Sequence, residues 1–296
     1  MERDLIGYGP NPPKIEWPGG ARIALSIVVN YEEGSERSPA WGDAVHETSG
    51  EIESTKPRDM RDYRLESQWE YGSRAGVWRV LRLLKKYDAK ATFFACGMAL
   101  ERNPALGPEL VAQGHAVCCH GYRWATQWDL AREDEREEIR RGIAAVERCT
   151  GARPLSWFTR GGVGENTRDL LVEEGFLYDS DAFNDDLPYY SYVNGKPWLV
   201  VPYTSDSNDG KWWKGGGWTT GEQFLDYIRD GFDMLYEEGS THPRMLVVAI
   251  HSRICGRPGR ALAVEHFLQH VRSHPGVWIA TRDEIAQWWL KRYPPA

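Results

Sequence analysis

The sequence lacks several features that would place it in a broad class of protein. Its five cysteines are an odd number and none forms a Cys-x-x-Cys pair, so neither a disulfide framework nor a cysteine zinc cluster is predicted. No apolar run approaches the roughly eighteen residues of a transmembrane helix. The amino-terminal residues lack the basic and then apolar order of a secretory signal. We therefore expect a protein of the reducing cytoplasm.

Basic charge and nucleotide-binding motifs are also missing. The formal net charge of −7 argues against nucleic acid and anionic membrane surfaces as partners. Neither a Gly-x-Gly-x-x-Gly stretch nor a Walker motif occurs, so no nucleotide cofactor is predicted. These absences leave a small-molecule substrate as the expected partner. The fourteen tryptophans and fourteen tyrosines fit either a core with a subunit interface or a pocket lined with rings.

Segments typical of strands and helices alternate about seven times along the chain. The expected strands are short apolar runs at 22–29, 90–96, 115–119, 155–158, 177–179, 198–201, 245–250 and 277–280. Helices are expected at 73–87, from Pro104 to Gly114, at 129–148, from Asn166 or Thr167 to Gly175, and at 222–238, 260–273 and 283–291. Residues 7–20 are expected to form an arm over the body, whereas 35–72 and 203–221 are expected to be long loops. The alternation predicts an α/β fold, an irregular TIM-like (β/α) barrel with seven or so parallel strands.

Four of the expected strands are followed by side chains that could take part in catalysis. Glu32 and Glu33 follow the first strand, and His120, Arg160 and His251 each follow a later one. Taken singly, each residue has a structural interpretation, such as a solvated acid or a hydrogen-bonding histidine. Because the carboxyl ends of parallel barrel strands meet on one face, their joint placement favours an active site.

These groups suit the hydrolysis of a carbonyl–nitrogen bond. A carboxylate can take a proton from water, and a histidine can give one to the leaving nitrogen. The developing oxyanion needs a positive or hydrogen-bonding group, which an arginine, backbone N–H groups or a metal ion would supply.

The order of these groups resembles that of the polysaccharide deacetylase superfamily, also called the NodB-homology or carbohydrate esterase family 4 group. That pattern is an acidic pair, a His-x-x-x-His segment, an arginine loop and a late strand ending in histidine. The chain is more similar still to the metal-independent allantoinases, in stretches such as Asn30-Tyr-Glu-Glu-Gly34, His120-Gly-Tyr-Arg-Trp124 and Gly256-Arg-Pro-Gly-Arg260. The resemblance implies one NodB-homology domain over 1–296 with an amino-terminal arm, a homotetramer, and a hydrolase of non-peptide C–N bonds.

The resemblance also implies a role for each matching residue. Glu32 matches the base, Glu33 stands at a metal-ligand position, and His251 matches the histidine that protonates the leaving group. His120 matches the first histidine of the His-x-x-x-His segment, and Trp124 stands where the second would be. Arg160 or Arg257 is expected to polarise the carbonyl, and the predicted substrate contacts are Trp124, Tyr122 and Arg257.

A bound metal ion is not expected. Both acids are glutamates where the deacetylases generally have aspartates, and Trp124 offers no ligand atom. One acid and one histidine remain, fewer than the three protein ligands of a catalytic zinc site. The alternative is a zinc ion held by Glu33 and His120.

Three functions are consistent with the sequence. The first is ring-opening of a small cyclic ureide or imide, such as allantoin to allantoate. The second is deacetylation of an N-acetylated sugar, and the third is a catalytically silent binding protein on the same barrel. Among the remaining residues, Asp206 and Asp209 could belong to a lid or a subunit contact. The helical histidines are expected to be surface groups: His242, His266, His270 and His274.

Overall fold

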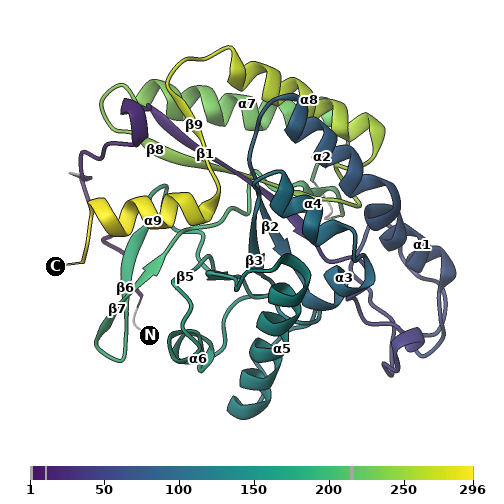
Figure 1. Ribbon diagram of the computed structural model, residues 1–296. Coiled ribbons are helices and arrows are strands. Elements are labelled where there is room, and N and C mark those ends of the chain that lie inside the picture. The colour runs from purple at the N-terminus through teal and green to yellow at the C-terminus, as the bar shows by residue number, and fades with distance from the viewer. Residues whose placement is uncertain (1–2, 11, 214–216, 296) are drawn as a thin grey trace.

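The structure is a computed structural model that describes residues 3–10, 12–213 and 217–295. A nine-stranded sheet curls into a half-barrel, with helices packed around its outside (Figure 1). The strands are β1 (Ile23–Tyr31), β2 (Thr92–Ala95), β3 (Ala116–Cys119), β4 (Ser156–Trp157), β5 (Tyr178–Asp179), β6 (Tyr189–Val193), β7 (Lys196–Val200), β8 (Arg244–His251) and β9 (Val277–Ile279). Their order is β6-β7-β5-β4-β3-β2-β1-β8, and β9 pairs with β1. The irregular, mostly parallel barrel expected from the sequence is confirmed.

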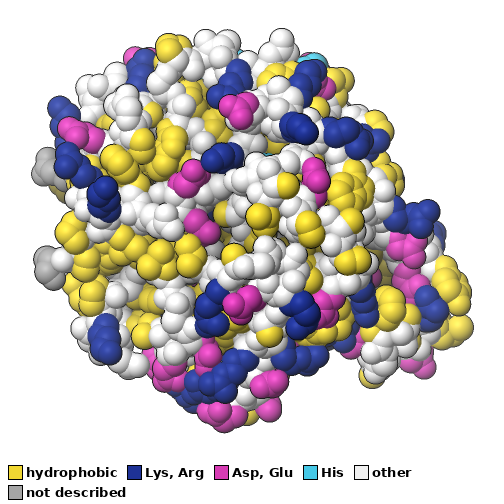
Figure 2. Space-filling model, in the orientation of Figure 1, with side chains coloured by type: hydrophobic (Ala, Val, Ile, Leu, Met, Phe, Trp, Pro, Cys, Tyr) yellow, Lys and Arg dark blue, Asp and Glu magenta, His cyan; other side chains and the backbone are white. Residues whose placement is uncertain are grey.

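Most of the helices connect one strand to the next, and the last helix follows β9. The helices are α1 (Tyr63–Tyr71), α2 (Val77–Lys86), α3 (Gly97–Arg102), α4 (Leu106–Ala112), α5 (Arg132–Thr150), α6 (Thr167–Glu173), α7 (Gly221–Glu238), α8 (Pro258–Arg272) and α9 (Arg282–Arg292). A π-helical turn at Gly72–Gly76 joins α1 to α2. The charged face of α5 is paired within itself and with α6, as in the contacts of Arg136 with Glu133 and Glu173. Figure 2 shows these mixed basic and acidic groups along the lower edge of the molecule.

Strand β1 pairs with β2, β8 and β9, and all nine of its residues are buried. Such a continuous apolar run is typical of a parallel strand covered on both faces. Its alternate side chains enter two cores. Ile27 and Val29 pack under the surrounding helices, whereas Ala24 and Val28 face the interior of the half-barrel, which also contains Trp17 and Trp289.

The strand register brings the carboxyl ends of β1, β2, β3 and β8 to one level. Asn30 pairs with His251 of β8, and Tyr31 pairs with Ala95 of β2. Ala95 in turn pairs with Cys119, the last residue of β3. The residues that follow these strand ends therefore lie at one edge of the sheet.

The observed elements differ from the expected ones in three places. Strand β6, which runs antiparallel to β7, was not predicted; the two join through Asn194 and Gly195, both at positive φ. Helix α1 lies inside the expected loop 35–72, and its amino terminus is capped by Asp62. The helix expected from Pro104 to Gly114 is present as α4, whereas the short helix α3 that precedes it was not expected.

The sheet is closed on its open side by chain segments rather than by a complete strand. Asn208 forms an isolated parallel bridge with Ala249 of β8, and the Met245 N–H donates to the Asp186 carbonyl oxygen at 2.9 Å. The amino-terminal arm lies over the body, where the Tyr8 hydroxyl donates to the Pro188 carbonyl oxygen. Among the described residues, no helix combines the length and the apolar character needed to cross a bilayer.

Candidate active site

The carboxyl ends of β1, β3 and β8 bring together four of the residues singled out in the sequence. Glu32 and Glu33 follow β1, His120 follows β3, and His251 ends β8. All four side chains are buried, and Glu32 is 2% exposed. A cluster of ionisable groups with so little exposure lies where barrel enzymes hold their catalytic residues.

Glu32 is the residue on which the cluster converges. Its Oε1 lies 3.4 Å from His120 Nε2 and 3.6 Å from His251 Nε2. Its Oε2 lies 2.7 Å from Nη2 of Arg253, a residue that the sequence interpretation missed. One carboxylate therefore contacts two imidazoles and one guanidinium.

Both histidines are oriented by an acceptor at Nδ1. His120 Nδ1 lies 2.8 Å from the Phe158 carbonyl oxygen, and its ring stacks on the Phe158 ring. His251 Nδ1 lies 2.6 Å from Asp209 Oδ1. Since a carbonyl or carboxylate oxygen accepts, each Nδ1 carries the hydrogen, and each Nε2 is the ring nitrogen that faces Glu32.

Asp209 fixes His251 more firmly than a single hydrogen bond would. It is fully buried, and its Oδ2 accepts from the backbone N–H groups of His251 at 2.7 Å and Cys255 at 3.2 Å. The sequence left Asp209 as part of a lid or a subunit contact. The structure corrects this, because the bridge between Asn208 and Ala249 brings the loop after β7 against β8.

Glu33 turns away from the histidines and is held by the backbone. Its Oε2 accepts from the Glu32 N–H and its Oε1 from the Arg253 N–H, both at 3.0 Å. The π-helical turn approaches so closely that a β-carbon at Gly72 would clash with the Glu33 carboxylate. The turn between α1 and α2 thus encloses this carboxylate, as π-bulges often do at functional sites.

Three tryptophans surround the Arg253 guanidinium. Its central carbon lies 3.9 Å from the ring centre of Trp69, 5.2 Å from Trp213 and 5.5 Å from Trp124. These distances are typical of cation–π contacts. These three rings therefore lie around the acidic cluster, and Trp69 and Trp124 also belong to the buried core.

The guanidinium and hydroxyl groups of three other predicted residues are engaged elsewhere. Arg160 donates to Glu47 Oε2 at 2.9 Å and to the Trp124 carbonyl oxygen at 2.8 Å. Arg257 stacks on Tyr71, and the Tyr122 hydroxyl donates to Glu101. The arginine at the acidic pair is instead Arg253. The sequence signal for it was its position two residues beyond His251.

Burial and charge separate the two acids. Burial alone would raise the pKa of Glu32, but the Arg253 charge and the two histidines oppose it and hold that pKa below its ordinary value. Burial raises the pKa of Glu33 to about 7, and the charge of Glu32 adds to this while Arg253 opposes it. At neutral pH Glu32 is therefore the ionised acid that faces the histidines.

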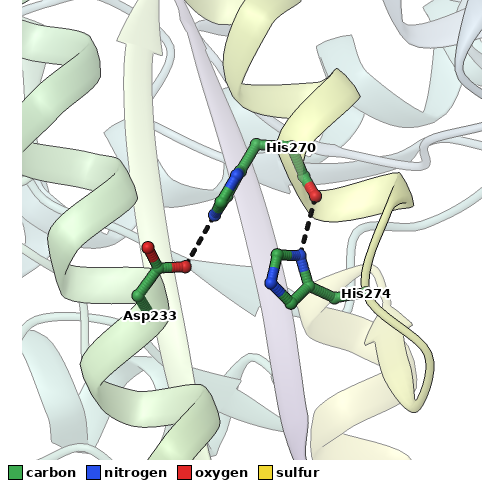
Figure 3. A group of neighbouring side chains, drawn as sticks. All are labelled: Asp233, His270 and His274. Atoms are coloured by element: carbon green, nitrogen blue, oxygen red, sulfur yellow. Dashed lines mark hydrogen bonds and ion pairs between the residues drawn. The ribbon is translucent and has the colours of Figure 1, made fainter.

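The residues of this cluster do not fit a metal site. Trp124 contributes only a ring, which packs against Trp69 with a centroid distance of 5.0 Å. Both oxygens of Glu33 already accept backbone N–H groups. Within the described ranges, the group of three ligand-type side chains with ligand atoms close together lies elsewhere, between α7 and α8: Asp233, His270 and His274 (Figure 3).

Comparisons with known proteins agree with this architecture. Residues 59–176 match the family model described as polysaccharide deacetylase. A protein of Schizosaccharomyces pombe assigned to the polysaccharide deacetylases is 38% identical and aligns over 99% of this chain and 98% of its own. The crystal structure of PuuE allantoinase has a TM-score of 0.95 and 46% identity, covering 100% of this chain and 99% of that one. A Pseudomonas aeruginosa PAO1 structure described as a probable polysaccharide deacetylase has a TM-score of 0.95 and 47% identity, with both chains fully covered.

Proposed function

Because the chain belongs to the polysaccharide deacetylase family, whose members hydrolyse C–N bonds, we propose that it opens the ring of a small cyclic ureide or imide. Allantoin is the first substrate to test, since the allantoinase similarity extends over the whole chain. The observation that carries the proposal is the single buried carboxylate of Glu32, set between two imidazole Nε2 atoms. This arrangement suits acid–base hydrolysis of an amide bond.

In the proposed reaction, Glu32 takes a proton from the attacking water. His251 gives the proton on its Nε2 to the leaving nitrogen, while Asp209 stabilises the charged imidazole before that transfer. Glu32 Oε1 lies 3.6 Å from His251 Nε2, so the proton taken from water can return to the same imidazole. His120 offers an Nε2–H donor, when protonated, to the water or to the developing oxyanion.

The reaction is proposed to need no metal ion. The misfit of Trp124 and Glu33 to a ligand set supports this, and a zinc site held by Glu33 and His120 is the alternative that the geometry disfavours. The presence of Glu32, His251 and Asp209 as a connected acid–base set argues against the third hypothesis, a silent binding protein. By resemblance, the working form is proposed to be a homotetramer, which light scattering coupled to gel filtration would test.

Deacetylation of an N-acetylated sugar is the second candidate, favoured by the family name of the yeast relative. Both candidates are tested by one panel of ureides, hydantoins, imides and acetylated amino sugars, each assayed with and without a chelator. We expect ring-opening of at least one cyclic substrate at an unchanged rate in chelator. Acetate release that chelator abolishes would favour the metal-dependent deacetylase instead.

Glu32→Gln is the matched variant for this panel, because the amide keeps the shape of the side chain and cannot accept the proton. We expect its kcat to fall by roughly 10²–10⁴-fold, the usual contribution of a general base. An unchanged rate for every substrate that the wild type opens would remove Glu32 from the mechanism.

A further inference from the structure

The acidic pair at the end of β1 is paired with a cation supplied by the chain itself. Arg253 Nη2 lies 2.7 Å from Glu32 Oε2, and Nη1 lies 3.8 Å from Glu33 Oε1. The guanidinium is 3% exposed and both carboxylates are at most 2% exposed. Two ionised carboxylates on adjacent residues, buried away from solvent, would repel each other strongly without such a positive charge.

The contact is chiefly one of charge. None of the Arg253 side-chain nitrogens meets an acceptor in hydrogen-bonding geometry, and Glu32 Oε2 likewise accepts no aligned hydrogen bond. The short distance between Nη2 and Oε2 is therefore an ion pair without a directed bond. The faces of Trp69, Trp124 and Trp213, rather than hydrogen bonds, fix the position of the guanidinium.

We infer that the Arg253 guanidinium is the built-in cation of this site. It supplies to Glu32 and Glu33 the positive charge that a bound divalent metal ion would otherwise supply. Trp124 belongs to the same arrangement, since its ring forms one wall of the guanidinium pocket in place of a ligand atom. Arg253 then acts as a positioning residue that keeps Glu32 ionised and directed at the two histidines. The catalytic consequence rests on the proposed function, whereas the charge role can be measured without any substrate.

The first test measures stability against pH. Arg253→Met leaves the two acids without their cation, so we expect its loss of melting temperature to be much larger at pH 8 than at pH 5. Arg253→Lys should keep most of the stability at both pH values, because the charge remains. Arg257→Met is the control; it removes a guanidinium that also stacks on a ring, that of Tyr71, and its effect should not change with pH. Equal pH dependence in the two methionine variants would overturn the inference.

The second test is chemical rescue of Arg253→Ala by guanidinium ions at low millimolar concentration. We expect a saturable rise in melting temperature that sodium does not reproduce, and recovery of part of the turnover of any substrate that the wild type opens. Neither effect is expected for Arg257→Ala. A wild type that opens no substrate would refute the proposed function alone, while an absent thermal rescue would count against the role of Arg253.

A separate observation points to a second site, on the outside of the barrel. Helices α7 and α8 bring together Asp233, His270 and His274, whose ligand atoms all lie within 4.8 Å of one another (Figure 3). His270 Nε2 lies 2.6 Å from Asp233 Oδ1. The two histidines, expected from the sequence to be surface groups, are half-buried against the Phe232 ring.

The orientation of His274 is the feature that favours a metal ion. Its Nδ1 lies 2.9 Å from the His270 carbonyl oxygen, which can only accept, so Nδ1 holds the hydrogen and Nε2 presents its lone pair. A hydrogen bond of this kind behind an imidazole is the usual support of a metal-binding histidine. We propose that these three side chains bind a divalent transition metal such as Zn²⁺, for which two imidazoles and one carboxylate are suitable ligands.

The test titrates the metal-free protein with Zn²⁺ by calorimetry. We expect one equivalent to bind, and His274→Ala and Asp233→Asn to weaken that binding at least about tenfold. His266→Ala is the control, because His266 lies exposed on the same helix outside the group. Absent binding at 1:1 stoichiometry, or binding unchanged in His274→Ala and His270→Ala, would mean that the group is only a hydrogen-bonded contact between α7 and α8.

Discussion

Replacement of Asp209 by asparagine separates the chemistry of the site from its stability. Asp209 Oδ1 accepts from His251 Nδ1, and Oδ2 accepts from the backbone N–H groups of His251 and Cys255. An asparagine has one oxygen for these two sides. The backbone N–H groups can only donate, so the amide oxygen must face them and the amide NH₂ must face Nδ1. The His251 ring then takes the hydrogen on Nε2 permanently and leaves Nδ1 as an acceptor.

The expected loss of kcat can be given a magnitude. A buried aspartate behind a catalytic histidine contributes about 10⁴ in kcat when its replacement by asparagine forces the wrong tautomer, as in serine proteases. That factor corresponds to about 5.5 kcal/mol of activation free energy. The folded state loses less than the roughly 1–3 kcal/mol that an unsatisfied buried hydrogen-bonding group costs, because all three hydrogen bonds of Asp209 keep a partner.

The assay is steady-state ring-opening of the best substrate of the panel, together with thermal unfolding of the same preparations. We expect kcat of Asp209→Asn to fall by roughly 10³–10⁴-fold while KM and the melting temperature change little. Asp209→Ala should lose both activity and stability, because it leaves three N–H groups without an acceptor. If Asp209→Asn keeps more than about a tenth of kcat, His251 does not act as the acid in the way proposed.

Three further outcomes are expected. Burial raises the pKa of Glu36 from 4.5 to about 7. The stability that its bound proton contributes is therefore complete below pH 4.5 and is lost as the pH rises through 7. Glu36→Gln should leave the free energy of unfolding nearly unchanged at pH 4.5 and should raise it by at most about 3 kcal/mol at pH 8. Denaturant unfolding at the two pH values checks this, and equal effects would contradict it. Gly72→Ala places a β-carbon on the Glu33 carboxylate, so kcat should fall severalfold or more and the melting temperature should drop, whereas Gly231→Ala, with open space around it, should raise or keep stability. Trp124→Phe keeps a ring wall but not its full area, so it should lower the melting temperature more at pH 8 than at pH 5 if the wall helps to hold the Arg253 charge.

Much of the fold follows from local pattern. The continuous apolar run of β1 and the alternation of strands with helices predict a parallel sheet, and parallel strands deliver their carboxyl ends to one edge. Glu32, His120 and His251 could therefore be grouped from the sequence. The hairpin of β6 and β7 could not be predicted in this way because β6 has no buried apolar run. Four of its five residues are exposed or half-buried.

The second layer of the site depends on contacts between distant segments. Asp209 reaches His251 across 42 positions of sequence, through a loop whose composition gives no sign of β8. Arg160 followed a strand as expected, but Glu47, from the long loop after β1, binds its guanidinium. Nothing within either segment predicts such a pair. The pairing decides which arginine is free to face the acids.

Trp124 was first notable for the ligand atom that it lacks, but its ring has a defined place of its own. It contacts Trp69, and its ring centre lies 3.6 Å from the central guanidinium carbon of Arg160 and 5.5 Å from that of Arg253. A histidine at this position would thus face two arginines, and a divalent ion bound to it would meet the charge already paired with Glu32 and Glu33. Restoring the ligand alone would therefore not restore a metal centre, because the cation position is occupied by Arg253. A change between a metal-free site and a metal-binding site therefore requires Trp124 and Arg253 to be replaced together. The two residues constitute one structural unit of the site.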